Sequence, residues 1–249
     1  MTTWMWLSRV VVAVEPTYLS LADELARVAA EARPGERLPS EHDLVAIRAV
    51  SRLTARAALQ ELERRHLVRR VRGSGTFVAR RIEYRVSPDM PPSWSETVRR
   101  AGGTPETRVL RAGTQRATGQ AAAALGLGRG ARVTAIRRVG IVDGVVANVA
   151  ASWVPQELAP VLADHVTAGG SIYAALRAQG LAPRRRWLRA GLEVVPSVEA
   201  GLLEFEGRPL VWLLEGLNED AATGRPIELS SSWMRPDVYR VVLELGPAQ

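Results

Sequence analysis

The sequence predicts an α+β protein with two domains: an N-terminal winged helix-turn-helix joined to a domain built on a mostly antiparallel sheet. Three observations predict this class. The 249 residues suit two small domains better than one. The first third shows helical periodicity followed by a short basic hairpin. The remainder mixes short helices with about six strand-like segments and has no regular strand–helix alternation.

The composition is that of an ordinary globular chain, with 47% hydrophobic and 24% charged residues. No apolar run approaches the ~20 residues of a membrane span. The absence of cysteine excludes disulfides, thiolate zinc sites and a cysteine nucleophile, and it fits a reducing cytoplasm. The three histidines lie far apart and lack metal-ligand spacing. We therefore predict no metal, no cofactor and no membrane partner.

The positive charge is concentrated in the first third of the chain. The net charge is +7, and residues 1–81 carry 14 arginines against 9 acidic residues, a net of +5. Such an excess is the expected footprint of contact with nucleic-acid phosphates. A generally basic surface is the alternative, and charge alone leaves the two equally open.

Two helices are predicted before residue 50. Apolar residues recur at helical spacing over residues 17–32, namely Tyr18, Leu21, Ala22, Leu25, Val28 and Ala29. Pro34-Gly35 ends this helix. The second helix begins at Ser40, which forms a capping box with Asp43, and runs to about Ala49.

A third helix is predicted over residues 52–65, with Ser51 as its N-cap. At about 100° per residue, one face is apolar and the opposite face carries Arg52, Leu53, Arg56 and Gln60. A helix with a packed back and an arginine-bearing front is typical of a recognition helix in the major groove. A solvated basic face on a structural helix is the alternative, and this helix alone leaves both open.

The segment after this helix favours the first interpretation. Residues 67–72 are predicted to be a strand, Gly73-Ser74-Gly75 a tight turn and residues 76–79 a returning strand. A short basic hairpin after three helices is a winged helix. Glycines at the wing tip allow the backbone to approach a phosphate or the minor groove.

Residues 17–80 resemble the GntR family of bacterial transcription regulators. The matching residues are Tyr18, Pro34-Gly35-Glu36-Arg37-Leu38-Pro39-Ser40-Glu41, Ser51-Arg52-Leu53-Thr54-Ala55-Arg56, Ala58-Leu59, Leu62-Glu63 and Gly73-Ser74-Gly75-Thr76-Phe77-Val78. The resemblance implies base contacts from the recognition helix, a phosphate contact from Thr54, and backbone contacts at the wing. The family usually carries arginine where this chain has His42, a weaker phosphate partner. The predicted DNA-binding residues are Ser40, His42, Ser51, Arg52, Leu53, Thr54, Arg56, Arg72, Gly73 and Gly75.

The expected domain boundaries follow from this pattern. Residues 1–15 are predicted to be a disordered leader, 16–81 the DNA-binding domain, 82–92 a connecting strand and linker, and 93–249 the second domain. In the second domain, helices are predicted over residues 93–101, 115–125 and 171–179. Strands are predicted over residues 107–112, 133–142, 145–153, 187–194, 209–218 and 227–234, with a hairpin turn at Asp143-Gly144.

The second domain resembles the UTRA effector domain of the HutC subfamily, which has a chorismate-lyase-like fold. The matching pieces are Gly102 with Thr104-Pro105, residues 122–125, Arg137-Arg138, Asp143-Gly144, Trp153-Val154-Pro155, Ser171-Ile172-Tyr173, Pro226-Ile227-Glu228 and Asp237-Val238-Tyr239. The resemblance implies dimerisation and a small, often anionic ligand over the sheet.

A strand arginine and a helix N-terminus would hold such an anion, and Glu228 would accept from a hydroxyl or amine. The predicted effector-binding residues are Arg137, Arg138, Ser171, Tyr173 and Glu228. Three of them have a simpler interpretation: Arg138 paired with a surface carboxylate, Ser171 a plain N-cap, and Glu228 a solvated strand residue.

The domain also departs from the subfamily. Gly140 replaces a second strand arginine, Ala150 an acidic residue and Met234 a tyrosine, so we expect a changed or more apolar ligand. The run Arg184-Arg185-Arg186 before Trp187 could stack on nucleic acid, but a charged turn is the favoured interpretation.

We therefore predict a homodimeric repressor that binds an inverted-repeat operator in double-stranded DNA and is released by a small effector. An enzyme of chorismate-lyase-like fold is the alternative. The sequence offers it no nucleophile–base pair and no metal-ligand set, so we expect no catalytic residues. A regulator fused to a pyridoxal enzyme is disfavoured because the chain has no lysine for a Schiff base.

Overall fold

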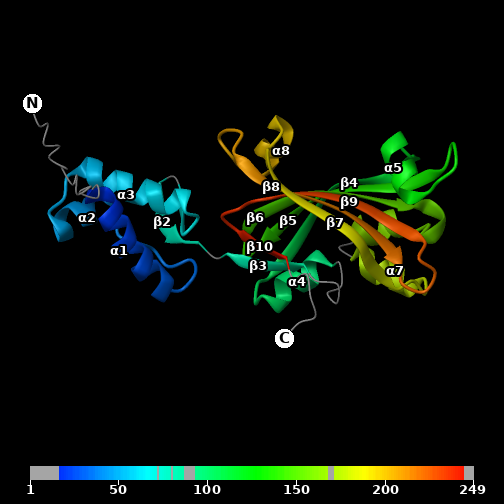
Figure 1. The fold of residues 1–249 in the computed structure, drawn as a ribbon, viewed down its shortest axis with the longest axis horizontal. Coiled ribbons are helices and arrows are strands. Elements are labelled where there is room, and N and C mark those ends of the chain that lie inside the picture. The colour runs from blue at the N-terminus through cyan, green and yellow to red at the C-terminus, as the bar shows by residue number, and fades with distance from the viewer. Residues whose placement is uncertain (1–16, 72, 80, 87–92, 168–170, 244–249) are drawn as a thin grey trace, which may run out of the picture. The chain divides into compact units, whose positions relative to one another are not determined.

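The structure is a computed structural model that describes residues 17–71, 73–79, 81–86, 93–167 and 171–243. The chain divides into two compact units, one ending at Arg80 and one beginning at Arg81. Each unit is described by itself (Figure 1). The predicted leader, residues 1–15, and Arg72 lie outside the described residues, so their predictions stay predictions.

The first unit is a winged helix. Its elements are α1 (Thr17–Glu31), α2 (Glu41–Arg48), α3 (Arg52–Arg64), β1 (Val68–Val71) and β2 (Gly75–Val78). The two strands pair antiparallel. The apolar faces of the three helices meet in one buried core that also takes in Val68 and Val78. Every element predicted from the sequence is present, with ends shifted by at most one residue.

Caps explain where α2 and α3 begin. The Ser40 backbone N–H donates to Asp43 Oδ2 at 2.9 Å, and the Asp43 N–H donates back to Ser40 Oγ at 3.2 Å. The predicted capping box is therefore confirmed. Ala49 ends α2 in the left-handed region at φ 51°. The chain then turns within a few residues, and Ser51 caps α3 by accepting from the Thr54 N–H at 3.0 Å.

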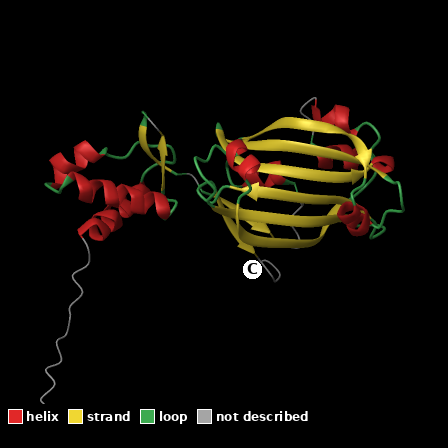
Figure 2. Ribbon diagram, turned by 90° about the horizontal axis from the view of Figure 1, so that it is seen from above, coloured by secondary structure: helices red, strands yellow, loops and turns green. Residues whose placement is uncertain are grey.

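The second unit is built on a six-stranded sheet whose paired neighbours all run antiparallel. In spatial order its strands are β4 (Pro105–Arg116), β5 (Arg132–Val142), β6 (Val145–Pro155), β9 (Pro226–Met234), β8 (Leu210–Asp220) and β7 (Pro183–Val194). Figure 2 shows these strands side by side. All six were predicted from the sequence, and most run further than their patterns indicated.

Helices cover both faces of this sheet (Figure 1). On what we call the inner face lie α4 (Trp94–Arg100), α6 (Leu162–Thr167) and α7 (Ile172–Ala178). On the outer face lie α5 (Gly119–Leu125) and α8 (Ser197–Leu202). A short 3-10 helix, Gln156–Leu158, follows β6. No helix in the described residues is long and apolar enough to span a membrane. The sequence analysis missed α6 and α8.

The first half of the predicted connecting segment, residues 82–92, is a strand that belongs to the second unit. Strand β3 (Ile82–Val86) pairs in parallel with β10 (Tyr239–Leu243) and packs on the inner face of the sheet. Its alternating side chains Ile82, Tyr84 and Val86 are buried there. The partner strand comes from the far end of the chain, a pairing that local sequence patterns do not reveal. Residues 87–92 lie outside the described part of the chain.

Two further expectations are corrected. The helix predicted over residues 115–125 begins only at Gly119, because Gln115 and Arg116 continue β4 against β5 and Thr118 caps the helix. The charged turn predicted at residues 184–186 is strand instead. Arg184 lies opposite Glu219 of β8, and its guanidinium pairs with that carboxylate at 2.6 Å. A cross-strand acid therefore lets this arginine run extend the strand.

Candidate functional sites: an arginine-rich surface and a buried polar cavity

The exposed side of α3 carries the residues predicted to contact DNA. Arg52, Leu53 and Arg56 are exposed, and Leu53 has 77% of its surface accessible. The opposite side, formed by Ala55, Ala58, Leu59 and Leu62, is fully buried in the core. Leu53 therefore adds an exposed apolar side chain to the arginine-bearing side of α3, which faces away from the core.

An acidic residue organises the arginines around this face. Glu41, at the start of α2, accepts from Arg56 Nε and Nη2 at 3.1–3.2 Å and from Arg70 Nη2 of β1 at 3.1 Å. Arg52 Nε lies 3.7 Å from the same carboxylate. Hydrogen bonds from Arg56, with further help from Arg70, lower the pKa of Glu41 despite opposing desolvation. We call Arg52, Arg56, Arg70 and Glu41 the arginine surface.

The sequence analysis did not single out Glu41 or Arg70 as site residues. Glu41 belongs to the Pro-Ser-Glu run that carried the family resemblance, so a signal was present. Arg70 stood in the predicted strand, but its proximity to α2 and α3 depends on how the hairpin folds back.

The remaining predicted DNA contacts divide into helix caps and an exposed side chain. The side chains of Ser40 and Ser51 are engaged as N-caps, and Thr54 Oγ1 lies 2.8 Å from Ser51 Oγ. His42 is exposed on the first turn of α2. These groups sit at the starts of α2 and α3, beside the arginine surface.

The wing turn needs its glycines. Gly73 and Gly75 adopt φ of 75° and 126°, a region that disfavours other residues. A Cβ on Gly75 would also lie 2.9 Å from Arg37 Nε. Arg37 therefore brings another guanidinium to the wing, which the sequence analysis did not assign to the site.

The structure separates the two arginines predicted to bind effector. Successive residues of a strand face opposite sides of the sheet. Arg138 accordingly lines a cavity of about 60 Å³ on the inner face together with Tyr173 and Glu228. Arg137 instead lines a hollow of about 500 Å³ on the outer face. We call the first of these the inner cavity and the second the outer hollow.

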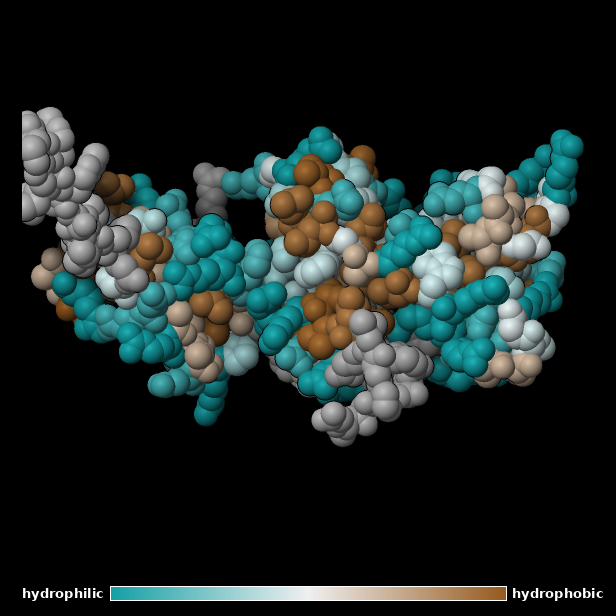
Figure 3. Space-filling view, in the orientation of Figure 1, coloured by the Kyte–Doolittle hydropathy of each residue, from teal (hydrophilic) through white to brown (hydrophobic). Residues whose placement is uncertain are grey.

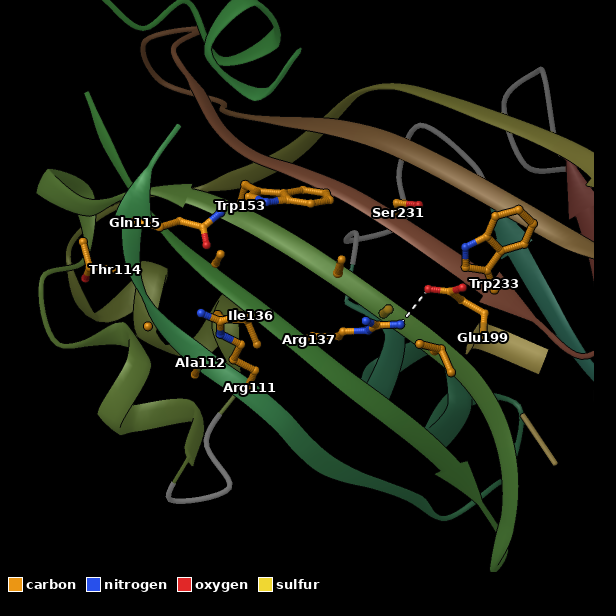
Figure 4. Close-up of a pocket in the computed structure, with 15 residues that line it drawn as sticks. Arg111, Ala112, Thr114, Gln115, Ile136, Arg137, Trp153, Glu199, Ser231 and Trp233 are labelled. Atoms are coloured by element: carbon orange, nitrogen blue, oxygen red, sulfur yellow. Dashed lines mark hydrogen bonds and ion pairs between the residues drawn. The ribbon is translucent and has the colours of Figure 1, made fainter. Parts of the chain in front are cut away.

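The outer hollow is larger, but the arginine predicted to bind effector is already paired there. Arg137 Nη2 pairs with Glu199 Oε1 of α8 at 2.6 Å, as Figure 4 shows. Pairing with a carboxylate was the alternative considered for Arg138, but it is Arg137 that makes such a pair. Arg138 Nη1 donates instead to Ser152 Oγ at 3.2 Å. The outer hollow is open and offers no unpaired buried charge, so we take the inner cavity as the stronger candidate for the effector site.

Glu228 lines the inner cavity and is fully buried, with 0% of its surface accessible. Its Oε2 accepts from the Tyr173 hydroxyl at 2.5 Å and from Asn218 Nδ2 at 2.8 Å. Asn218 Nδ2 also lies 2.9 Å from the Tyr173 hydroxyl. Burial and the neighbouring carboxylate raise the pKa of Tyr173 well above its ordinary value. The interpretation of Glu228 as a solvated strand residue is therefore wrong.

Ser171 serves as the N-cap of α7, because its Oγ accepts from the Ala174 N–H at 3.4 Å. It also lines a neighbouring cavity of about 150 Å³, which shares Trp94, Arg138 and Tyr173 with the inner cavity. Ser171 is thus near the candidate site, but its side chain already has a structural role.

The structure explains why residue 140 is glycine. A Cβ there would lie 2.2 Å from Asn148 Oδ1 and 2.7 Å from Trp94 Cζ2. Both side chains are fixed by Tyr239, whose hydroxyl accepts from Trp94 Nε1 at 2.8 Å and donates to Asn148 Oδ1 at 3.2 Å. The space that a strand arginine at this position would need is therefore occupied.

An exposed arginine-bearing recognition helix and a separate polar cavity define the class: a DNA-binding regulator with a ligand-binding domain. Comparison with known families places the chain more narrowly. Residues 17–78 match the gntR family of bacterial regulatory proteins, and residues 100–240 match the UTRA domain. The chain belongs to the GntR family and carries a UTRA effector-binding domain.

Similar proteins support the same assignment. The transcriptional regulator GgaR of Escherichia coli K12 is 28% identical over 231 residues, covering 92% of this chain and 91% of the relative. The transcriptional repressor NagR of Bacillus subtilis is 29% identical over 235 residues, covering 91% and 93%. The crystal structure of PhnF from Mycobacterium smegmatis superposes with a TM-score of 0.64 at 27% identity, covering 91% of this chain and 99% of that one.

These relatives decide between the two functions considered from the sequence. The chain is a DNA-binding transcription regulator and not an enzyme. The predicted fold class, a winged helix-turn-helix joined to a mostly antiparallel UTRA domain, is confirmed.

Proposed function

We propose that the protein is a homodimeric repressor of the HutC subfamily, released from an inverted-repeat operator when a small effector occupies the inner cavity. The observation that carries the effector part is the inner cavity itself. It is a buried polar space, its central carboxylate is only partly hydrogen-bonded, and its wall includes the strand that follows the DNA-binding unit. The name of the Bacillus subtilis relative supports repression as the direction of control.

In the DNA complex, α3 would enter the major groove with Arg52 and Arg56 on base edges. Arginine recognises guanine through two hydrogen bonds, and an exposed leucine such as Leu53 suits the thymine methyl. The starts of α2 and α3, with Ser40, His42, Ser51 and Thr54, would face phosphates, and the wing would follow the adjacent backbone. Glu41 would hold Arg56 and Arg70 in a defined orientation before DNA arrives.

A second copy would supply the second half of the inverted repeat. Support for self-association comes from four aliphatic side chains that gather around α8 and the adjoining ends of β7 and β8 (Figure 3). Each of them is at least half exposed: Leu192, Val194, Val198 and Leu210. Contiguous apolar side chains of this kind mark interaction surfaces.

Strand β3 offers a route from effector to DNA. Tyr84 of β3 lines the inner cavity, and β3 begins at Ile82, directly after the boundary between the two units. Tyr84 also packs edge-on against Tyr239 of β10, with ring centroids 6.0 Å apart. A ligand that contacts Tyr84 would favour one position of β3 over another. Only such differential affinity can shift the population of DNA-binding arrangements.

The test begins with DNA selected from a random pool by the purified full-length protein. We expect an inverted repeat bound by one dimer, measured by fluorescence anisotropy together with light scattering. Thermal unfolding is then followed against phosphonates, sugar phosphates, urocanate-like acids, fatty acids and small carboxylates. A ligand at ~100 times its Kd adds about 2.7 kcal/mol to native-state stability, a shift of roughly 5–10 °C.

The stabilising compound should then weaken binding to the selected DNA. A monomer bound to a sequence without repeat symmetry would contradict the dimer. A ligand that binds the protein and strengthens DNA binding would contradict release by effector.

A further inference from the structure

The inner cavity is lined by two oppositely charged side chains that each have a buried, unsatisfied atom. Among the described residues, three buried side-chain atoms lack a hydrogen-bond partner, and two of them, Glu228 Oε1 and Arg185 Nη1, belong to residues lining this cavity. Folded proteins satisfy nearly all such atoms. The pair therefore marks where the donor and the acceptor of a ligand would be placed.

Neighbouring groups hold the Glu228 carboxylate in position. Tyr173 and Asn218 both donate to Oε2, which fixes the carboxylate and leaves Oε1 as its available acceptor. The hydroxyl and amide that orient the carboxylate are themselves buried, so the arrangement is set before any ligand binds.

A strand irregularity distinguishes Arg185 from its neighbours. Arg184 and Arg186 both lie near Glu219, at 2.6 and 3.7 Å, whereas Arg185 lines the inner cavity. The register between β7 and β8 shifts between Arg185 and Trp187. Such bulges re-aim side chains next to functional sites. Arg185 therefore lines the inner cavity, whereas Arg184 and Arg186 interact with Glu219.

The charge of the cavity limits the ligand. Its charged lining residues are Arg138, Arg185 and Glu228, a net of +1. All three act on one phenol: burial raises the pKa of Tyr84, both guanidiniums lower it, and Glu228 raises it. A monoanion neutralises this set, whereas a zwitterion leaves the excess positive charge in place.

The size of the cavity limits the ligand further. A volume of about 60 Å³ has room for roughly four to six water-sized groups. A sugar phosphate exceeds this space, and Trp94 and Asn148 already fill the position beside Gly140.

We propose that Arg185 is the anion-binding residue of the inner cavity and that the effector is a small 2-hydroxycarboxylate of about the size of glycolate or lactate. The carboxylate would accept from Arg185 and Arg138, and the 2-hydroxyl would donate to Glu228 Oε1. This inference rests on the proposed function, in which the inner cavity is the effector site.

The experiment compares acids that differ by one hydroxyl group. Calorimetry with the full-length protein measures glycolate against acetate and lactate against propionate, with inorganic phosphate and glucosamine 6-phosphate as further probes. We expect each hydroxy acid to bind at least about tenfold more tightly than its partner, because only it satisfies the buried carboxylate oxygen.

Substitutions then assign the groups. Arg185→Gln should weaken both hydroxy acids at least about tenfold, whereas Arg186→Gln, a matched change one residue along the same strand, should not. Glu228→Gln should bring the affinity ratio of lactate to propionate close to one. Unfolding midpoints of all three variants check that each protein is folded.

Several outcomes would overturn the inference: equal affinity within each acid pair, no binding of either hydroxy acid, or equal effects of the Arg185 and Arg186 substitutions. Release of the selected DNA by glucosamine 6-phosphate but not by hydroxy acids would also overturn it, while leaving the proposed function intact. Failure to select any DNA would instead remove the proposed function, whatever the acids do.

Discussion

The arginine surface and the inner cavity both combine arginines with one glutamate, yet they treat charge in opposite ways. On the arginine surface, Arg52, Arg56 and Arg70 gather around Glu41 where water reaches them. In the inner cavity, Arg185 and Glu228 keep buried atoms without partners. Exposed ion pairs change the free energy of folding only slightly. A buried charge without a partner, in contrast, destabilises the fold strongly.

This difference separates two kinds of site. The arginine surface can exchange Glu41 for phosphates or bases with little change in its own free energy, which suits reversible DNA binding. The inner cavity contains buried charged atoms without partners, which is unfavourable for the unliganded protein. A ligand of the right charge would supply these partners, and this arrangement suits an effector switch. Perturbing the two sites should therefore affect different measurements.

The largest expected effect is on DNA binding. Arg52→Ala together with Arg56→Ala should weaken binding to the selected DNA by roughly two to four orders of magnitude, because each bidentate base contact contributes strongly. Anisotropy measures the affinity, and circular dichroism shows an unchanged fold. Arg64→Ala is the matched control, since Arg64 lies at the other end of the same helix and pairs with Glu61. Retained affinity in the double variant would refute the assignment of α3 as the recognition helix.

The next effect concerns packing around the inner cavity. Gly140→Ala should destabilise the second unit by about 1–3 kcal/mol, the usual range for overpacking, because its Cβ would clash with Asn148 and Trp94. Urea unfolding measures the change. Gly113→Ala, on the adjacent strand β4, is the control, since a Cβ there meets nothing within 4 Å. Equal stability of the two variants would show that Asn148 and Trp94 can move aside at little cost in stability, despite their hydrogen bonds to Tyr239.

A smaller effect belongs to the start of α2. Ser40→Ala removes the side-chain half of the capping box and should lower the stability of the first unit by about 1 kcal/mol. Because the cap does not touch the inner cavity, the affinity for any effector should stay the same. Ser74→Ala, at the tip of the wing, is the control. A variant that loses effector affinity but keeps its stability would contradict the expectation that the cap acts on the stability of the first unit alone.

The smallest effect is a pH dependence at Glu61. Hydrogen bonds from Arg64 and Arg65 lower its pKa from 4.5 to about 2. A carboxylate with a lowered folded-state pKa stabilises the fold above its unfolded pKa, and that contribution is lost as pH falls towards the folded value. Glu61→Gln should therefore slightly lower the urea midpoint at pH 7, with the difference shrinking between pH 4.5 and about 2. Glu31→Gln is the control, and a difference independent of pH would exclude this cause.

Much of the first unit could be predicted because its signals are local. The capping residues Ser40 and Ser51, the apolar back of α3 and the glycines of the wing each act within a few residues of the chain. Their positions in the structure match the predictions almost residue for residue. The signal for Glu41 was also present, but its role as partner to three arginines required the fold of the hairpin.

In the second unit, local sequence patterns predicted the strands but not all of their pairings. Local patterns predicted the six strands of the sheet, although β6 is buried on both faces and β4 and β7 are mostly exposed. The parallel pairing of β3 with β10 joins segments more than 150 residues apart in sequence, which no local pattern reports. The same holds for Arg137 and Arg138, which are adjacent in sequence but face different sides of the sheet.

The sequence by itself determined the two-domain organisation, the recognition helix and the identity of the polar groups available for an effector. Only the tertiary structure decided which of these groups meet. It places Arg185 and Glu228 in the lining of one cavity, fills the space beside Gly140, and puts Arg137 on the other face of the sheet. The physical reason is that helices and caps depend on short-range hydrogen bonds and periodicity, whereas a buried cavity depends on strand register and packing between distant segments.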